Sequence, residues 1–304
     1  MKIALANSTW GKVNILRQTV QYSGVSSSAR FVVNKGDFKS CDFLLATDFD
    51  DRYEQEWFKD FPIERRVCLC MENPLVWSPT AEHFSQFGVV ITPFPNSVPK
   101  TIQYQSVIQS LPCVPWFYDI DFSTRSGLLH VPLKSRSELG WLMDRPIPKK
   151  RKLISMILSS KRLNKGYEWR LEFAAGLKRA LGEALDIYGF GHNPLANKKD
   201  AIDPYLITVV LENSSHPFYI TEKVADAVLG WAMPVYCGSV TMESLLEGYP
   251  WQIEFGSDIT SSCRRVKRYV NEIISNKTSL RSIRELLLSR LNLFEEVPLA
   301  LQRL

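Results

Sequence analysis

Long apolar runs are missing from this chain of 304 residues. No 18 consecutive residues are all apolar, so the sequence offers no candidate transmembrane helix, and the first apolar run (MKIALA) is too short for a signal peptide. Its six cysteines form no C-x-x-C pair, which favours free thiols in a reducing compartment. His83, His130 and His216 show no ligand spacing with cysteines or acids, so we expect no zinc site. The dinucleotide fingerprint G-x-G-x-x-G is also absent.

Short apolar segments that alternate with helical patterns are present in both halves of the chain. In the first half they predict strands over 2–6, 30–33, 41–47, 65–71 and 88–94, and helices over 14–22 and 52–59. In the second half they predict strands over 153–158, 185–188, 205–211 and 233–236, and helices over 167–181 and 222–231. Strands alternating with helices are typical of parallel β-α-β units, so we expect two Rossmann-like, doubly wound α/β domains facing a cleft.

A proline-rich, charged segment at 143–152 (MDRPIPKKRK) marks the expected boundary between the domains. The predicted domains are therefore 1–145 and 152–260, followed by a basic helical tail over 261–304. In such sheets ligands bind beyond the carboxyl ends of the strands, so residues that directly follow a strand are the first candidates for a site.

The net charge of 37 − 32 = +5 is unevenly distributed. Residues 145–170 carry nine basic side chains against one acidic, and residues 261–304 carry nine against four. Local basic zones favour anionic ligands or surfaces. The tail, in which Arg264, Arg265, Lys267 and Arg268 cluster, predicts either a helix packed across the domains or a peripheral contact with an anionic membrane.

The densest set of polar residues lies in the second half, after the strand expected over 205–211. Thr221 is a suitable N-cap of the following helix, Glu222 suits its first turn, and Lys223 adds a positive charge. The N-terminus of a helix attracts anions, because its free N–H groups and its dipole both favour negative charge. A capped helix with a solvated lysine is the alternative.

A second polar cluster follows the strand expected over 153–158. Ser159, Ser160 and Lys161 come after this strand, and Arg170 lies on the next helix. Backbone amides beside a guanidinium suit a diphosphate, because the planar fork of arginine can donate two parallel hydrogen bonds. A charged surface loop is the alternative, but two such clusters in one domain favour a bound phosphate.

These clusters carry a family resemblance. The segment from Glu212 to Ser239, ENSSHPFYITEKVADAVLGWAMPVYCGS, resembles the donor-binding motif of glycosyltransferase family 10, the α-1,3-fucosyltransferases. The segments 159–173 (SSKRLNKGYEWRLEF) and 186–194 (DIYGFGHNP) resemble its bacterial members. The resemblance implies a GT-B architecture with an N-terminal acceptor domain and a C-terminal donor domain. It also implies GDP-fucose as the donor, inversion at the anomeric carbon and no metal.

The resemblance also implies roles for individual residues. Arg170 and Lys223 would hold the diphosphate, and Glu222 would contact sugar hydroxyls. The other residues expected to line the donor site are Asn213, Tyr219, Thr221, Ser160 and Lys161. The general base would be Glu72, in VCLCMENP, although a carboxylate that caps the turn before Pro74 is the alternative.

A competing carboxylate pattern, D-x-D, lies at Asp48 to Asp50, after the strand expected over 41–47. This pattern holds a divalent cation in another glycosyltransferase fold, but we interpret it here as an exposed acidic turn that could contact an acceptor.

Taken together, the sequence predicts a cytoplasmic, peripherally membrane-bound fucosyltransferase. It would transfer fucose from GDP-fucose, in an α-1,3 or α-1,4 linkage, to an oligosaccharide or glycolipid acceptor containing N-acetylglucosamine or glucose. No nucleic-acid partner is expected. Use of another nucleotide sugar, or binding of a sugar nucleotide or glycan without turnover, are the alternatives.

Overall fold

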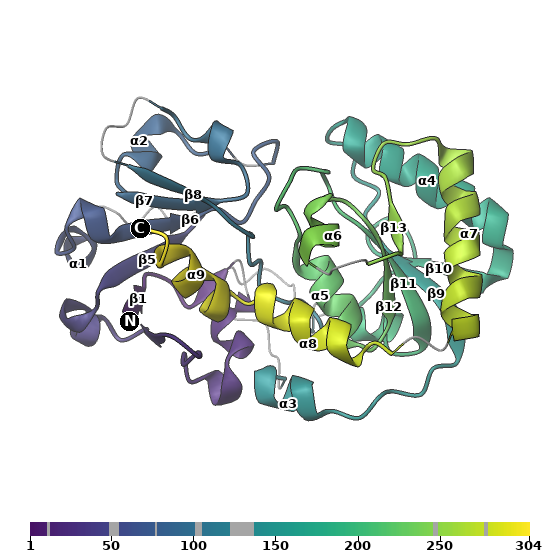
Figure 1. Ribbon diagram of the computed structural model, residues 1–304, viewed down its shortest axis with the longest axis horizontal. Helices are drawn as coiled ribbons and strands as arrows, with labels where there is room; N and C mark the ends of the chain where they lie inside the picture. Colours follow the sequence, from purple (N-terminus) through teal and green to yellow (C-terminus); the bar gives the residue numbers. More distant parts are fainter. Residues whose placement is uncertain are drawn as a thin grey trace.

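Two parallel β-sheets, one in each half of the chain, form the framework of the protein (Figure 1). The computed structural model describes residues 1–10, 13–48, 55–76, 78–100, 105–121, 137–245, 249–276 and 279–304. The predicted fold class, two Rossmann-like α/β units, is confirmed.

The first sheet has the strand order β4-β1-β5-β6-β7-β8, and all its neighbours are parallel. Its central strands are apolar runs buried on both faces, which is the pattern of a sheet covered on both sides. The strands are β1 (Lys2–Leu5), β4 (Arg30–Val32), β5 (Phe43–Thr47), β6 (Arg66–Leu69), β7 (Val89–Thr92) and β8 (Ser106–Gln109). A short hairpin of β2 (Thr9–Trp10) and β3 (Val13–Asn14) follows β1.

The second sheet has the order β10-β9-β11-β12-β13 and is also parallel. Its strands are β9 (Lys152–Ile157), β10 (Leu185–Tyr188), β11 (Tyr205–Leu211), β12 (Met233–Cys237) and β13 (Gln252–Ile253). Figure 1 shows α4 (Lys165–Leu181) and α7 (Ile259–Asn276) on the side of this sheet away from the first half, whereas α5 (Glu222–Leu229) lies toward the first half. The carboxyl ends of β9 and β11 lead into the two polar clusters.

The remaining helices are short or lie at the C-terminus. They are α1 (Glu56–Lys59), α2 (Ala81–Phe84), α3 (Leu139–Asp144), α6 (Thr241–Leu245), α8 (Arg281–Arg290) and α9 (Leu293–Leu301). Helix α7 packs on α4, and α8 packs on α5. The chain then returns to the first half, where Phe294 of α9 packs edge-on against Phe31 of β4. Figure 1 shows α8 and α9 crossing between the halves, with both termini in the first.

The expected strands are all present. Sequence patterning missed β8, of which one residue is buried, and the two-residue strands β2, β3 and β13. The helix predicted over 14–22 is wrong. Its place is taken by two short 3-10 helices, Ile15–Gln18 and Val20–Tyr22. Thr19 between them is extended (φ −122°, ψ 155°), and Gln21 adopts a left-handed conformation (φ 52°). In the predicted helix over 52–59, the described part is helical only over Glu56–Lys59, and residues 52–54 lie outside the described residues.

All six cysteines are free and buried. Within the parts of the chain described above, no helix combines the length and apolar character that a membrane crossing requires.

Candidate functional site

A cavity of about 550 Å³ lies between the two halves, beyond the carboxyl ends of their strands. The first half contributes Trp10, Glu72 and Phe117 to its lining. From the second half come charged and polar residues of α4, α5 and the loops around them: Lys161, Arg170, Lys198, Asn213, Tyr219, Thr221, Glu222, Lys223 and Asp226. The cavity therefore brings together residues that are more than 100 positions apart in the chain.

Arg170 is placed by α4, which begins where the side chain of Asn164 caps the amides of Gly166 and Tyr167. Its guanidinium is 4% exposed and donates to the side-chain oxygen of Asn213, just after β11. Its Nε has no hydrogen-bond partner among the described residues. Burial lowers the pKa of Arg170, but the group stays charged because arginine titrates far above neutrality. A buried guanidinium that faces a neutral amide leaves positive charge available to an anion.

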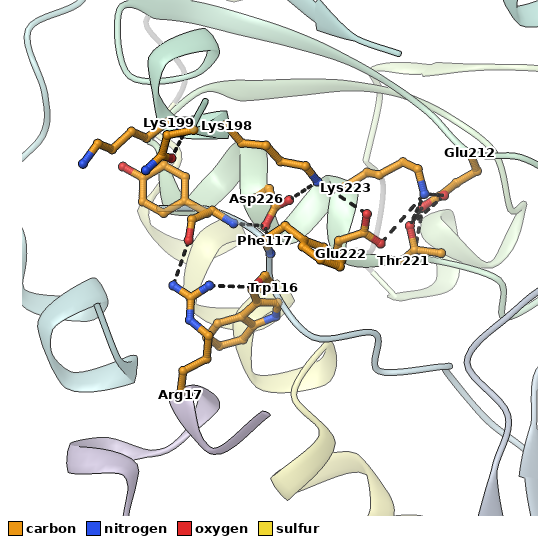
Figure 2. Close-up of polar contacts among 12 residues, drawn as sticks. Arg17, Trp116, Phe117, Lys198, Lys199, Glu212, Thr221, Glu222, Lys223 and Asp226 are labelled. Carbon is orange, nitrogen blue, oxygen red and sulfur yellow. Dashed lines mark hydrogen bonds and ion pairs between the residues drawn. The ribbon is translucent and has the colours of Figure 1, made fainter. Parts of the chain in front are cut away.

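The carboxylate of Glu212, which directly follows β11, organises the start of α5. It accepts hydrogen bonds from the amide and hydroxyl of Thr221 at 2.8 Å each, and from the ammonium of Lys223 at 3.0 Å (Figure 2). Thr221 occupies the N-cap position as predicted, but its hydroxyl binds Glu212 instead of capping the helix. The oxygens of Glu212 are engaged by protein groups, so this fully buried carboxylate is structural.

Glu222 directly follows Thr221, and its contacts with ammonium groups are longer than that of Glu212. Its two carboxylate oxygens face two ammonium groups, Oε1 at 3.5 Å from Lys198 and Oε2 at 3.8 Å from Lys223 (Figure 2). Although burial raises the pKa of Glu222, these two cations lower it below its usual value. An ionised carboxylate with such loose contacts retains lone pairs that can accept hydroxyl hydrogens.

Glu72 enters the cavity from the opposite side, after β6. Burial raises the pKa of its carboxyl, Lys223 lowers it, and Glu222 and Glu212 raise it, so that the pKa lies above the usual value. Its own carboxylate accepts a hydrogen bond of 3.3 Å from the amide of Asn73. A half-buried carboxyl whose pKa is raised above its usual value suits proton transfer.

The carboxylate of Asp48 fixes the backbone at Glu72 through hydrogen bonds. Its Oδ2 accepts the amides of Met71 at 2.6 Å and of Glu72 at 2.5 Å, and its Oδ1 accepts the indole N–H of Trp10 at 3.1 Å. The interpretation of Asp48 as part of an exposed acidic turn is therefore wrong, because this side chain is 2% exposed and its oxygens are occupied. Asp50 and Asp51 lie outside the described residues.

Most of the residues predicted for the site come together in the cavity. Ser160 does not line it, because its side chain lies against Gly191, and Ser159 lines it instead. Sequence reasoning missed Lys198 and the role of Asp226. Asp226 stands inside the quoted motif, whereas Lys198 lies in a loop without a motif. Among the described residues, no group of three or more His, Cys, Asp or Glu side chains is arranged to hold a metal ion.

Comparison with known proteins finds a family model that matches part of the chain. Residues 147–281 match the C-terminal domain of glycosyltransferase family 10 (fucosyltransferase). The human 4-galactosyl-N-acetylglucosaminide 3-alpha-L-fucosyltransferase is 40% identical over 57 residues, which is 18% of this chain and 16% of that protein. The bovine 3-galactosyl-N-acetylglucosaminide 4-alpha-L-fucosyltransferase is 33% identical over 111 residues, 33% of this chain and 29% of that protein. The chain thus matches less than a third of the length of either relative.

Among solved structures, an alpha1,3-fucosyltransferase superimposes with a TM-score of 0.47 and 19% identity, over 91% of this chain and 78% of that one. The family match over residues 147–281 contains α4, the loop after β11 and α5, which carry Arg170, Asn213 and Glu222. Through this segment, which is less than half of the chain, the protein is similar to glycosyltransferase family 10, the fucosyltransferase family.

Proposed function

We propose that this protein is an inverting, metal-independent fucosyltransferase. It moves fucose from GDP-fucose to a hydroxyl of a glycan containing N-acetylglucosamine or glucose, through an α-1,3 or α-1,4 linkage. The observation that carries the proposal is the shared cavity, in which the Glu72 carboxyl from one half faces Lys223, with Arg170 nearby, from the other.

The donor side of the proposal rests on the two cations. Departure of GDP puts negative charge on the diphosphate, and Arg170 and Lys223 stabilise this charge when no metal does so. Arg170 is the stronger candidate for direct contact, because its guanidinium binds a neutral amide, whereas Lys223 already binds Glu212. Asn213, Tyr219 and Thr221 complete the wall around these groups.

The acceptor side rests on Glu72. As the acceptor oxygen bonds to the anomeric carbon, its proton passes to the Glu72 carboxylate, and the carbon–oxygen bond to the diphosphate breaks with its electron pair leaving on GDP. Inversion needs one base and no covalent sugar–enzyme intermediate. The carboxyl group must be within about 2.6–3.2 Å of the hydroxyl in the productive complex.

Two alternatives predict different binding. An enzyme for another nucleotide sugar would prefer GDP-mannose or a UDP-sugar, and a protein without turnover would bind the donor but never transfer it. Isothermal titration with GDP, GDP-fucose, GDP-mannose and UDP-sugars in EDTA, followed by an acceptor screen, separates the three. Binding of GDP and GDP-fucose in EDTA, with transfer, is expected. Binding that requires manganese would contradict the metal-independent mechanism.

The exposed face of α7 supports a second partner. Ser261, Arg264, Arg265 and Arg268 line an open groove of about 320 Å³ on this helix. As part of the proposal, this face contacts an anionic membrane surface, each basic residue contributing up to about 1 kcal/mol, and places the enzyme on the cytoplasmic side of the membrane. Co-sedimentation with anionic vesicles at low salt tests this contact, and absence of binding would refute it.

A further inference from the structure

Lys198 lines the cavity but lies outside the segments 159–173, 186–194 and 212–239 that carry the family resemblance. It begins a short 3-10 helix (Lys198–Ala201) in the loop after β10, and its ammonium reaches the start of α5 (Figure 2). There it lies 2.6 Å from Oδ2 of Asp226 and 3.5 Å from Oε1 of Glu222. Because two carboxylates already share this ammonium, it is a poor candidate for binding a phosphate and a good one for fixing a carboxylate.

The position of the Lys198 ammonium is fixed on a further side by Phe117. The ammonium lies 4.9 Å from the centre of the Phe117 ring, a cation–π contact, and this ring packs against Trp10 with centroids 6.1 Å apart. Phe117 and Trp10 both line the cavity from the first half of the chain.

Asp226 links the ammonium of Lys198 to the backbone of Phe117 and Tyr118. Its Oδ1 accepts the amides of Phe117 at 2.9 Å and Tyr118 at 2.8 Å, while Oδ2 takes the ammonium of Lys198. The carboxylate is 1% exposed, so these contacts are shielded from water. Asp226 therefore sets where Lys198 lies, and Lys198 in turn lies beside Glu222.

The environments of Glu212 and Glu222 show which of these two carboxylates Lys198 can orient. Glu212 has its oxygens filled by Thr221 and Lys223. The contacts of Glu222 to Lys198 and Lys223 are longer, and its side chain lines the cavity. We infer that Lys198 is a positioning residue that holds the Glu222 carboxylate oriented toward the sugar of the donor, so that it governs recognition of the sugar but not of the nucleotide. This inference rests on the proposed function.

The test compares the affinities for GDP and for GDP-fucose, measured by isothermal titration in EDTA without acceptor. In Lys198→Met, we expect the affinity for GDP to stay within about twofold of the wild type and the affinity for GDP-fucose to fall about tenfold, as for loss of a charge-assisted contact. Lys198→Arg should restore most of the difference. Lys199→Met is the matched control, because Lys199 pairs with Asp119 at 2.6 Å and does not line the cavity.

A structural role for Lys198 as the counter-ion of Asp226 predicts another result. Lys198→Met leaves Asp226 buried without its cation, so the double variant Lys198→Met with Asp226→Asn removes the uncompensated charge while still depriving Glu222 of its neighbour. Selective loss of GDP-fucose affinity in the double variant supports the inference.

If the folded double variant keeps the wild-type ratio of the affinities for GDP and GDP-fucose, or loses both affinities equally, the proposed role of Lys198 is wrong. The proposed function is then not affected. Wild-type protein that binds neither ligand overturns the proposed function, and the role of Lys198 with it.

Discussion

At the scale of single residues, the proposed chemistry depends on the Glu72 carboxyl. Glu72→Gln keeps the shape of the side chain and removes the base, so we expect transfer to fall by about 10²–10⁴-fold while the affinity for GDP stays unchanged. Single-turnover transfer and titration with GDP measure the two quantities. Glu82→Gln, at an exposed carboxylate on α2, is the control. Full activity of Glu72→Gln would assign the base to another group.

The pH profile of the wild type gives an independent check on Glu72. Burial and the neighbouring carboxylates raise its pKa above the usual 4.5, although Lys223 opposes this. A base must be ionised to act, so the rate of transfer should fall as the pH drops through this raised pKa, earlier than an exposed glutamate would require.

Asp48, beneath Glu72, makes a separate prediction about stability. Burial raises the pKa of Asp48 from 3.8 to about 7, against the opposing effect of its hydrogen bonds. The folded state therefore binds the proton of Asp48 more tightly than the unfolded state does. This binding adds to the free energy of unfolding below about pH 4, and the addition is lost as the pH rises to about 7. The shift corresponds to about 4 kcal/mol at most.

Asp48→Asn removes this titration, and it also weakens the contact with the Trp10 indole at every pH. We therefore expect the difference in melting temperature, variant minus wild type, to be larger at pH 8 than at pH 5. Thermal melts at both values test this, with Asp144→Asn at an exposed position as the control. A difference that does not depend on pH would show that the wild-type Asp48 is ionised throughout.

At the scale of helices and strands, periodicity located the elements that are long or fully buried. The run over Tyr205–Leu211 is a central strand, and the spacing of Phe173, Ala174 and Leu177 gives the buried face of α4. The helix predicted over 14–22 is wrong, because the helical spacing of apolar residues cannot reveal a residue such as Gln21 that leaves the helical conformation. Strand β8 lacked a signal because only Ile108 is buried.

The site was predictable where chemistry follows a strand within one motif, as at Asn213 and Glu222. It was not predictable where the partner is distant in the chain. The contact of Asp226 with Phe117 spans 109 positions, and that of Asp48 with Glu72 spans 24. No spacing in the sequence encodes such tertiary pairs.

The loop after β10 shows how one element shapes the cavity. Gly189 has φ 116°, and a Cβ there would lie 2.2 Å from the carbonyl oxygen of Leu158. Gly189→Ala should push this loop away from β9, lower the free energy of unfolding by about 1–3 kcal/mol and weaken GDP binding. Gly256→Ala is matched, because Gly256 also has positive φ but its Cβ would meet open space. Equal effects of both variants on GDP binding would show that strain alone, and not the contact with Leu158, matters.

At the scale of the whole molecule, the proposed chemistry requires the two halves to keep Glu72 and the proposed donor site in register. Segment 116–118 is held from both sides: Asp226 accepts its amides, and Arg17 donates to the carbonyls of Trp116 at 2.6 Å and Tyr118 at 2.7 Å (Figure 2). The C-terminal helices add a second connection, since the Trp116 indole donates to the carbonyl of Leu291 and the hydroxyl of Ser110 to Glu296. A base on one half and cations on the other cooperate only if these connections hold.

Arg17→Met tests this coupling. Arg17 is 1% exposed, and burial lowers its pKa to about 10, so the group is a buried cation whose hydrogen bonds all go to oxygen atoms of distant segments. Its loss leaves buried carbonyls unpaired, and we expect the free energy of unfolding to fall by about 3–5 kcal/mol. Because the residues proposed to bind GDP lie on the second half, kcat should fall more than the affinity for GDP. Arg30→Met, at an exposed position on β4, is the control. A loss of GDP affinity as large as the loss of kcat would mean that Arg17 supports the second half itself and not its register with Glu72.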